Sequence, residues 1–154
     1  MIIVSDTSAV TSLLQVGRLT ILSSLYREVV VPTEVADVLQ RFHAVLPDFI
    51  RVLPVADRVR LEKLKSELDL GEAAAIALML EGKGDVLLMD ERRGRRVAAR
   101  EGLAVVGLIG VLLEARQRGL ITSLVTVIGE LEQVAGFRIS PQLKERALQA
   151  AGEK

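Results

Sequence analysis

The sequence predicts an α/β domain in which helices cover both faces of a central parallel sheet. Short runs of β-branched and aliphatic residues alternate along the chain with longer segments that have helical spacing. Acidic residues directly follow two of the short apolar runs, which is typical of the carboxyl ends of parallel strands. Hydrophobic residues make up 50% of the 154, enough for one sizeable core, so we expect a single domain over residues 1–154.

The first half of the chain is predicted to begin with a β-α-β unit. The run at residues 2–5 is short and mostly β-branched, as in a buried strand, and the next segment carries apolar residues at helical spacing up to Gly17. Pro32 follows a second β-branched run and favours a helix start, because its fixed φ suits a first turn. The expected elements are strands at 2–5, 29–31 and 50–53, helices at 8–16, 19–26 and after Pro32, a loop at 43–48 and a charged helix at 56–68.

The second half is predicted to alternate between helices and strands and to end in two helices. Asp69 and Glu72 have the spacing of a capping box, in which each side chain accepts a hydrogen bond from the other's backbone N–H. Glycines separate the alanine-rich helix that follows from the next strand. The expected elements are helices at 73–80, 92–100, 111–118, 123–134 and 141–150 and strands at 86–89 and 104–106.

Composition excludes several classes of site. The chain has no cysteine and a single histidine, His43, which excludes disulfides, thiolate metal sites and multi-histidine zinc centres. The 20 acidic residues balance 20 basic ones, so any surface that binds nucleic acid must be local. No apolar stretch reaches the roughly 18 residues of a membrane span, and no signal-like segment follows Met1. We therefore expect a cytoplasmic protein that does not associate with membranes.

Three acidic residues are the candidate catalytic and metal-binding side chains. Asp6 and Asp90 each follow a predicted strand and Glu72 opens a helix, so the three can converge at one edge of a parallel sheet. Carboxylates without nitrogen or sulfur partners suit Mg²⁺ or Mn²⁺, which can activate water against a phosphodiester. Each acid taken alone is better explained as a helix cap. The metal-site hypothesis therefore depends on their occurring together.

Four short motifs follow one another along the chain: Asp6-Thr7-Ser8, Leu70-Gly71-Glu72-Ala73, Met89-Asp90-Glu91-Arg92 and Val106-Gly107-Leu108-Ile109-Gly110. In this order they resemble the motifs of PIN-domain proteins, and more narrowly the PIN-like branch related to VapC-type toxins. The resemblance extends from Met1 to about Ala151. It implies a single PIN-like domain with Mg²⁺- or Mn²⁺-dependent ribonuclease activity, in which acids surround the ion and water attacks an RNA phosphate.

The resemblance also assigns roles to individual residues. It implies that Asp6, Glu72 and Asp90 are the catalytic acids that bind the metal. Thr7 and Ser8 match the small polar positions beside the first aspartate, where they are candidates for substrate binding.

Two further positions change the expected acid set. Glu91 fills a neighbouring position that is often acidic in the family, and it is a candidate metal ligand that acts through water. Val38 stands where the family usually has a glutamate, six residues after the proline that corresponds to Pro32. Glu34 lies about one helical turn before Val38 and faces a similar direction, so it is the candidate replacement.

Five arginines between positions 92 and 100 form a basic segment beside Asp90. A solvated helix face explains exposed charges in general. However, Arg92 and Arg93 fall in the first helical turn, where a cation opposes the macrodipole at a cost of ~0.3–1 kcal/mol, so an anion is expected nearby. We expect Arg92 and Arg96 to contact the RNA backbone, with a partly structural role for Arg95 or Arg96.

The leading functional hypothesis is an endoribonuclease that acts as the toxin of a toxin–antitoxin pair. Its expected partners are RNA, a cognate antitoxin and a second copy of the chain, because residues 111–113 and 124–131 offer more apolar positions than one small sheet can cover. The alternative is a PIN-like scaffold, catalytically weakened by Val38, that binds protein or RNA. A haloacid-dehalogenase-like phosphatase would need an acid where Ser8 stands, and a response-regulator receiver would need paired acids before its strand-end aspartate.

Overall fold

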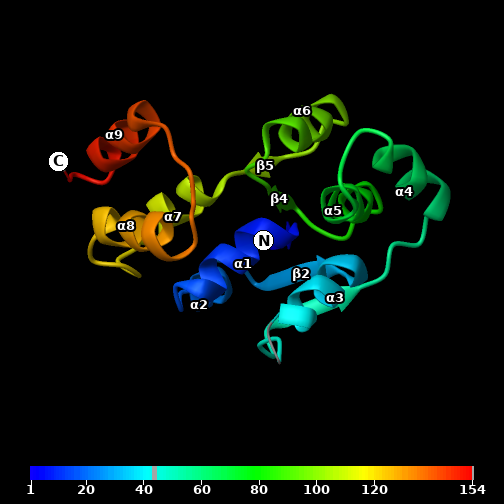
Figure 1. The fold of residues 1–154 in the computed structure, drawn as a ribbon, viewed down its shortest axis with the longest axis horizontal. Coiled ribbons are helices and arrows are strands. Elements are labelled where there is room, and N and C mark those ends of the chain that lie inside the picture. Colours follow the sequence, from blue (N-terminus) through cyan, green and yellow to red (C-terminus); the bar gives the residue numbers. More distant parts are fainter. Residues whose placement is uncertain (43–44, 154) are drawn as a thin grey trace.

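The computed structural model describes residues 1–42 and 45–153 and is built around a five-stranded sheet (Figure 1). The strands lie in the order β3-β2-β1-β4-β5, and every neighbouring pair is parallel. The predicted α/β class is therefore confirmed. The strands are β1 (Ile2–Ser5), β2 (Glu28–Pro32), β3 (Ile50–Leu53), β4 (Val86–Leu88) and β5 (Val105–Val106).

Helices connect the strands and continue after the last one. Between the strands lie α1 (Thr7–Gln15), α2 (Thr20–Leu25), α3 (Thr33–Phe42), α4 (Arg58–Lys65), α5 (Leu70–Leu80) and α6 (Arg92–Arg100). After β5 come α7 (Leu108–Gln117), α8 (Leu124–Val134) and α9 (Pro141–Ala150). Figure 1 shows these last three helices grouped at one side of the molecule, with α6 across from α9.

The two faces of the sheet are covered by different helices. Side chains alternate along a strand, so Ile3 and Val4 of β1 point in opposite directions. Ile3 belongs to a buried cluster with residues of α1, α2, α3, α7, α8 and α9, whereas Val4 belongs to a second cluster with residues of α4, α5 and α6. Both residues are 0% exposed, which fits the continuous apolar run expected of a strand buried on both faces.

The strand register brings two of the predicted site residues to the same edge. In the central pair, Ser5 of β1 lies opposite Leu88 of β4, and both strands run in the same direction. Asp6 follows the first strand directly and Asp90 follows the second after one further residue. The carboxyl edge of the sheet therefore presents both aspartates, as the sequence predicts.

Several predicted boundaries were wrong by a few residues. The helix expected at 111–118 begins at Leu108, because a side chain distant in the sequence caps it, as described below. The helix expected at 56–68 is limited to Arg58–Lys65, and its side-chain cap is Asp57. The capping box of Asp69 and Glu72 is confirmed. The loop expected at 43–48 includes residues 43 and 44, so the position of His43 lies outside the described residues.

The apolar faces that suggested a homodimer are used inside the chain. Val111 and Leu112 of α7 and Leu124 and Leu131 of α8 are all 0% exposed and belong to the cluster around Ile3. The sheet and the C-terminal helices therefore cover one another at these positions, whereas Val125 of α8 is 42% exposed, and the homodimer stays a prediction. None of the helices in the described ranges combines the length and the apolar character that crossing a membrane requires.

Candidate active site

Asp6 lies at the turn from β1 into α1 and is almost completely buried. Its Oδ1 accepts a hydrogen bond from the Ala9 backbone N–H at 3.4 Å, which makes it the N-cap of α1. The hydroxyl of Ser8 donates to Oδ2, also at 3.4 Å. Only 2% of the residue is exposed. The two hydrogen bonds are long, so they compensate little of the cost of burying a carboxylate.

The pKa of Asp6 is raised from 3.8 to about 7. Burial is the largest cause, and the negative charges of Asp90, Glu72 and Asp69 add to it, while the Ala9 N–H acts in the opposite direction. Near neutral pH this carboxyl is partly protonated unless a cation lies beside it.

Glu72 is held at the start of α5 by the capping box. Its backbone N–H donates to Asp69 Oδ1 at 2.8 Å, and its own Oε1 accepts from the Asp69 N–H at 3.3 Å. Gly71 brings this turn against α1, since a Cβ there would lie 2.8 Å from the hydroxyl oxygen of Thr7. The pKa of Glu72 is raised, first by burial and then by the charges of Asp69 and Glu91.

Asp90 links the end of β4 to the start of α7. Its Oδ1 accepts a hydrogen bond from the Leu108 backbone N–H at 3.0 Å, although the two residues are 18 positions apart. Arg95 donates to the Met89 carbonyl at 3.0 Å, which places its positive charge beside Asp90. The pKa of Asp90 is nevertheless raised, because desolvation of the carboxyl outweighs the Leu108 N–H and Arg95. The structural role expected of Arg95 is confirmed.

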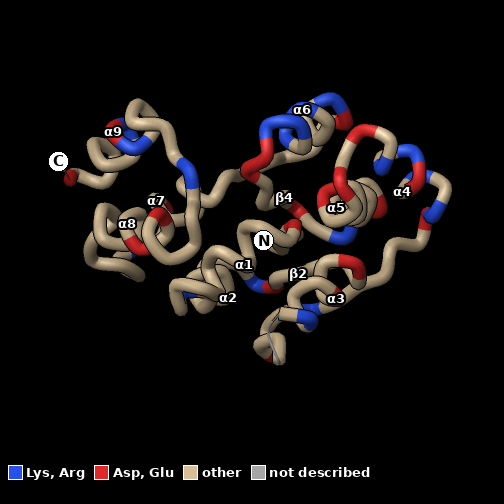
Figure 2. Tube along the Cα trace, in the orientation of Figure 1, with Lys and Arg blue, Asp and Glu red and all other residues tan. Residues whose placement is uncertain are grey.

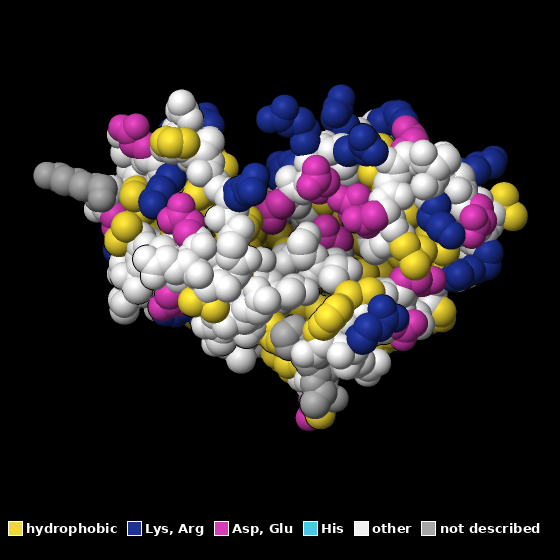
Figure 3. Space-filling view, viewed as in Figure 1, with side chains coloured by type: hydrophobic (Ala, Val, Ile, Leu, Met, Phe, Trp, Pro, Cys, Tyr) yellow, Lys and Arg dark blue, Asp and Glu magenta, His cyan; other side chains and the backbone are white. Residues whose placement is uncertain are grey.

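Two of the acids face one pocket and the third faces another. Asp6, Glu72 and Asp69 line a pocket of about 420 Å³, together with Thr7 and Ser8. Asp90 lines a larger groove of about 790 Å³. In Figure 3, acidic side chains gather near the middle of this face with basic side chains above them. Asp6 and Glu72 therefore share one pocket and Asp90 lies in the other, although the charges of Asp90 and Glu72 both act on Asp6.

The acids are not arranged as a preformed cage. Within the described ranges, no group of three or more aspartate, glutamate or histidine side chains is placed to ligate one ion. Mg²⁺ does not need such a cage, since it keeps several waters and is usually held by one or two carboxylates and the substrate's phosphate. Hard oxygen donors around a buried carboxyl with a raised pKa fit such an ion, because a cation would favour the ionised form.

The position expected to hold a further glutamate lies in the smaller pocket. Val38 of α3 lines this pocket, and its side chain is partly exposed there. Glu34 does not line it. Instead its Oε2 accepts a hydrogen bond from Arg58 Nη1 of α4 at 3.0 Å, and its Oε1 is buried without a partner among the described residues. Glu34 therefore does not take the place of the missing glutamate in this arrangement.

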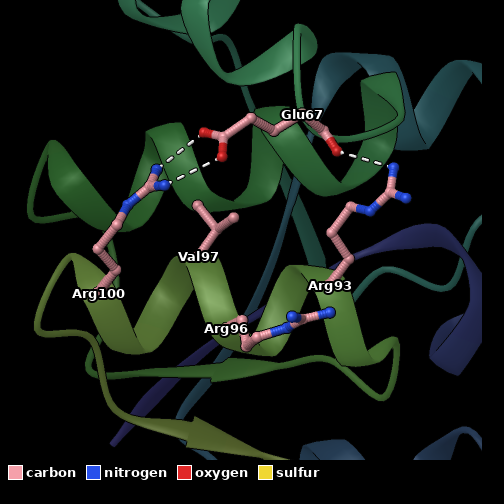
Figure 4. Close-up of a pocket in the computed structure, with 5 residues that line it drawn as sticks. All are labelled: Glu67, Arg93, Arg96, Val97 and Arg100. Carbon is pink, nitrogen blue, oxygen red and sulfur yellow. Dashed lines mark hydrogen bonds and ion pairs between the residues drawn. The ribbon is translucent and has the colours of Figure 1, made fainter.

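The arginines of α6 divide into two sets, so Arg92 and Arg96, both expected to contact the RNA backbone, lie in different pockets. Arg93 and Arg100 both bind Glu67, the first through its backbone carbonyl at 3.3 Å and the second through a bidentate pair at 2.9 and 3.0 Å (Figure 4). Arg96 lines the same pocket of about 510 Å³. Of the α6 arginines, Arg92 and Arg95 line the groove that contains Asp90.

Sequence reasoning missed the residues that reach this groove from the C-terminal part of the chain. Phe137, Arg138 and Arg146 line it. Figure 2 shows basic positions along α6 and, across from it, in α9 and the segment before α9. Nothing in the local sequence of these three lining residues distinguishes them, because their proximity to Asp90 arises only from the packing of α9 beside α7.

Comparison with known proteins agrees with this geometry. A family model described as a PIN domain matches residues 2–153. A comparison with curated protein sequences finds no match. PIN domains are generally metal-dependent nucleases, and three carboxylates at the carboxyl edge of a parallel sheet are the side chains that such chemistry requires. Since the match covers nearly all of the chain, the protein belongs to the PIN-domain family.

Proposed function

We propose that this protein is an endoribonuclease that uses Mg²⁺ or Mn²⁺ to hydrolyse RNA phosphodiesters. The observation that carries the proposal is the buried Asp6 carboxyl, whose pKa is raised to about 7 next to Asp90 and Glu72. A fold gains no stability from crowding buried acids, so such a cluster indicates a functional site. Family membership supports nuclease chemistry for the protein.

The four acidic residues would have different roles at the ion. Asp6 and Asp90 would hold the ion directly, whereas Glu72 and Glu91 would act through bound water, because the Glu72 carboxylate is already engaged in its capping box. When bound, the divalent ion would lower the pKa of a water and polarise the phosphodiester. Asp6 is only 2% exposed, and its ionised carboxylate would hold the positively charged ion at the edge of the sheet.

Neighbouring polar residues would orient the substrate. Thr7 and Ser8 line the pocket beside Asp6, where their hydroxyls can bond to a phosphate or a ribose. Arg92 lines the groove beside Asp90 and can contact a phosphate there. Arg96 faces the pocket around Glu67 on the other side of α6, so we propose that it contacts only RNA that extends beyond the cleavage site.

The biological role that we propose is that of a toxin in a toxin–antitoxin pair. It rests on the resemblance of the sequence to the VapC-related branch. A cognate antitoxin would inhibit the enzyme by covering the acidic edge of the sheet. The proposal of a homodimer rests on the same resemblance, since the apolar faces of α7 and α8 are buried within the chain.

RNA cleavage by charge-neutralised variants tests the proposal. Purified wild type should cleave a generic single-stranded RNA when Mn²⁺ or Mg²⁺ is added, and Asp6→Asn and Asp90→Asn should lose at least two orders of magnitude in rate, a loss typical of groups that act in the transition state. Asp37→Asn is the matched control, because Asp37 is exposed on α3 and lies in none of the pockets described above. Cleavage by both aspartate variants at the wild-type rate would contradict the proposal.

A second candidate function has a specific observation in its favour. Val38 places an apolar side chain in the pocket where an acid is expected, and the described acids do not form a preformed cage. A catalytically weakened scaffold that binds RNA or protein would have these features. Binding of RNA by wild type without any cleavage in Mn²⁺ would favour this function over the first.

A further inference from the structure

Arginines without an acidic partner are concentrated around one groove. Throughout the described ranges, seven arginines take part in no ion pair, and four of them, Arg92, Arg95, Arg138 and Arg146, line the groove of about 790 Å³ that contains Asp90. The other three, Arg41, Arg93 and Arg96, do not line it, whereas the arginines on the opposite edge strand, on α4 and at the end of α7 are all paired. Unpaired cations that share a surface repel one another, so their grouping indicates an anionic ligand.

The groove has two basic sides and an apolar floor. Arg92 and Arg95 come from α6, while Arg138 precedes α9 and Arg146 belongs to it. Figure 1 shows α6 and α9 on either side of β5 and the start of α7. The floor residues are apolar and include Val106, Ile109, Leu113, Phe137 and Ile139.

These features match the two parts of a single-stranded nucleic acid. Guanidinium groups form bidentate hydrogen bonds with phosphates. Exposed bases stack on an aromatic ring or lie on apolar surface, and Phe137 is partly exposed in the groove. A duplex hides its base faces and could not use the floor. An acidic peptide could pair with the arginines, but it would leave most of the apolar floor without a partner.

We propose that this groove holds a single-stranded segment of RNA on the side of the cleavage site next to Asp90. Its phosphates lie along the arginines of α6 and α9, and its bases lie on the floor around Phe137. The inference rests on the proposed function, because Asp90 belongs both to the groove and to the acid cluster. The C-terminal helix α9, which contributes none of the predicted acids, then determines the preference for unpaired RNA.

Binding without catalysis tests this assignment. Affinity of a fluorescent single-stranded RNA is measured in EDTA over a range of salt concentrations for wild type, for Arg138→Gln/Arg146→Gln and for the control Arg51→Gln/Arg118→Gln. The control removes the same charge from exposed arginines on β3 and at the end of α7. We expect the groove variant to bind about 10- to 30-fold more weakly at ~0.1 M salt, with a salt slope smaller by about 1.4, because each phosphate contact contributes ~0.7 for single strands.

Other outcomes would overturn the inference. Equal affinity of the groove variant and the control would remove Arg138 and Arg146 from the binding surface. Equal binding of duplex RNA, or full competition by poly-glutamate, would show that the groove recognises charge alone. Thermal melts establish that both double variants fold. The binding assay contains no metal, so its result does not depend on cleavage. A protein that binds RNA through these arginines in EDTA but does not cleave it in Mn²⁺ or Mg²⁺ would refute the proposed function and leave the groove assignment standing.

Discussion

Gly107 packs against Asp90 so closely that it has no room for a side chain. A Cβ on Gly107 would lie 2.9 Å from Asp90 Oδ1 and 2.9 Å from Arg95 Nη1. The backbone at Gly107 has φ of −92° and ψ of 168°, a conformation open to any residue, so a Cβ here conflicts only with space and would displace the ends of the Asp90 and Arg95 side chains. The absence of a side chain allows the Asp90 carboxylate to reach the Leu108 N–H and keeps Arg95 beside it.

Gly107→Ala should therefore reduce RNA cleavage by about tenfold or more, since misplacing a reacting group by about 1 Å can cost two orders of magnitude. Gly129→Ala is the control, because a Cβ at that position in α8 meets nothing within 4 Å and alanine favours a helix. The control should melt at a higher temperature and cleave normally. Undiminished cleavage by Gly107→Ala would show that the position of Asp90 is not critical.

The raised pKa of Asp6 predicts how stability depends on pH without metal. Because the pKa rises from 3.8 in the unfolded chain to about 7 in the folded one, folding takes up a proton between these values and stability falls as pH rises through this window. Asp6→Asn keeps a good N-cap and removes the charge, so it should be more stable than wild type by a few kcal/mol at pH 8. Chemical denaturation in EDTA should show that the extra stability of Asp6→Asn over wild type decreases toward pH 5. A stability difference that does not depend on pH would contradict the raised pKa of Asp6.

Divalent cations should stabilise the wild type by binding only the folded acid cluster. A concentration ~100 times the dissociation constant would add about 2.7 kcal/mol to the free energy of unfolding. Thermal melts with and without Mn²⁺ should show a large increase for wild type and Asp37→Asn and a much smaller one for Asp6→Asn and Asp90→Asn. Equal increases in all four proteins would indicate that the ion binds elsewhere.

Val38 and Glu34 allow a direct test of the incomplete acid set. Since Val38 lines the pocket beside Asp6 and Glu72, Val38→Glu should add an oxygen donor and increase Mn²⁺ affinity or RNA cleavage. Glu34→Gln should leave cleavage unchanged, because Glu34 pairs with Arg58 outside this pocket. Val59→Glu adds the same charge at an exposed position of α4 and serves as the control. If Val38→Glu only lowers the melting temperature, Val38 is simply a packing residue.

The sequence was sufficient to predict the elements whose signals are local. Residues 2–5 and 86–89 were identified as strands because they are continuous apolar runs, and the acids after them were placed correctly because parallel strands end at one edge. The capping box was also predictable, since Asp69 and Glu72 are three residues apart. These parts of the site depend on short-range geometry that spacing determines.

The remaining parts depend on contacts between distant segments. The start of α7 depends on a hydrogen bond between Leu108 and Asp90, and the direction of Glu34 depends on Arg58, which is 24 residues away. The groove requires α9 to lie across from α6, which no periodicity in either helix indicates. The division of the α6 arginines was missed for the same reason, because it depends on the position of Glu67.

Each of the three candidate catalytic acids also accepts a hydrogen bond from a backbone N–H at the start of a helix. Asp6 caps α1, Glu72 completes the cap of α5, and Asp90 binds the first N–H of α7. Natural variants that lose nuclease activity would therefore still be selected to keep an oxygen acceptor at these positions, because an alanine would leave helix ends unsatisfied at a cost of ~0.5–2 kcal/mol each. Asparagine or glutamine would meet that structural requirement without charge. In a set of related chains, the ratio of acid to amide at these positions would separate active nucleases from inactive descendants better than retention of the fold.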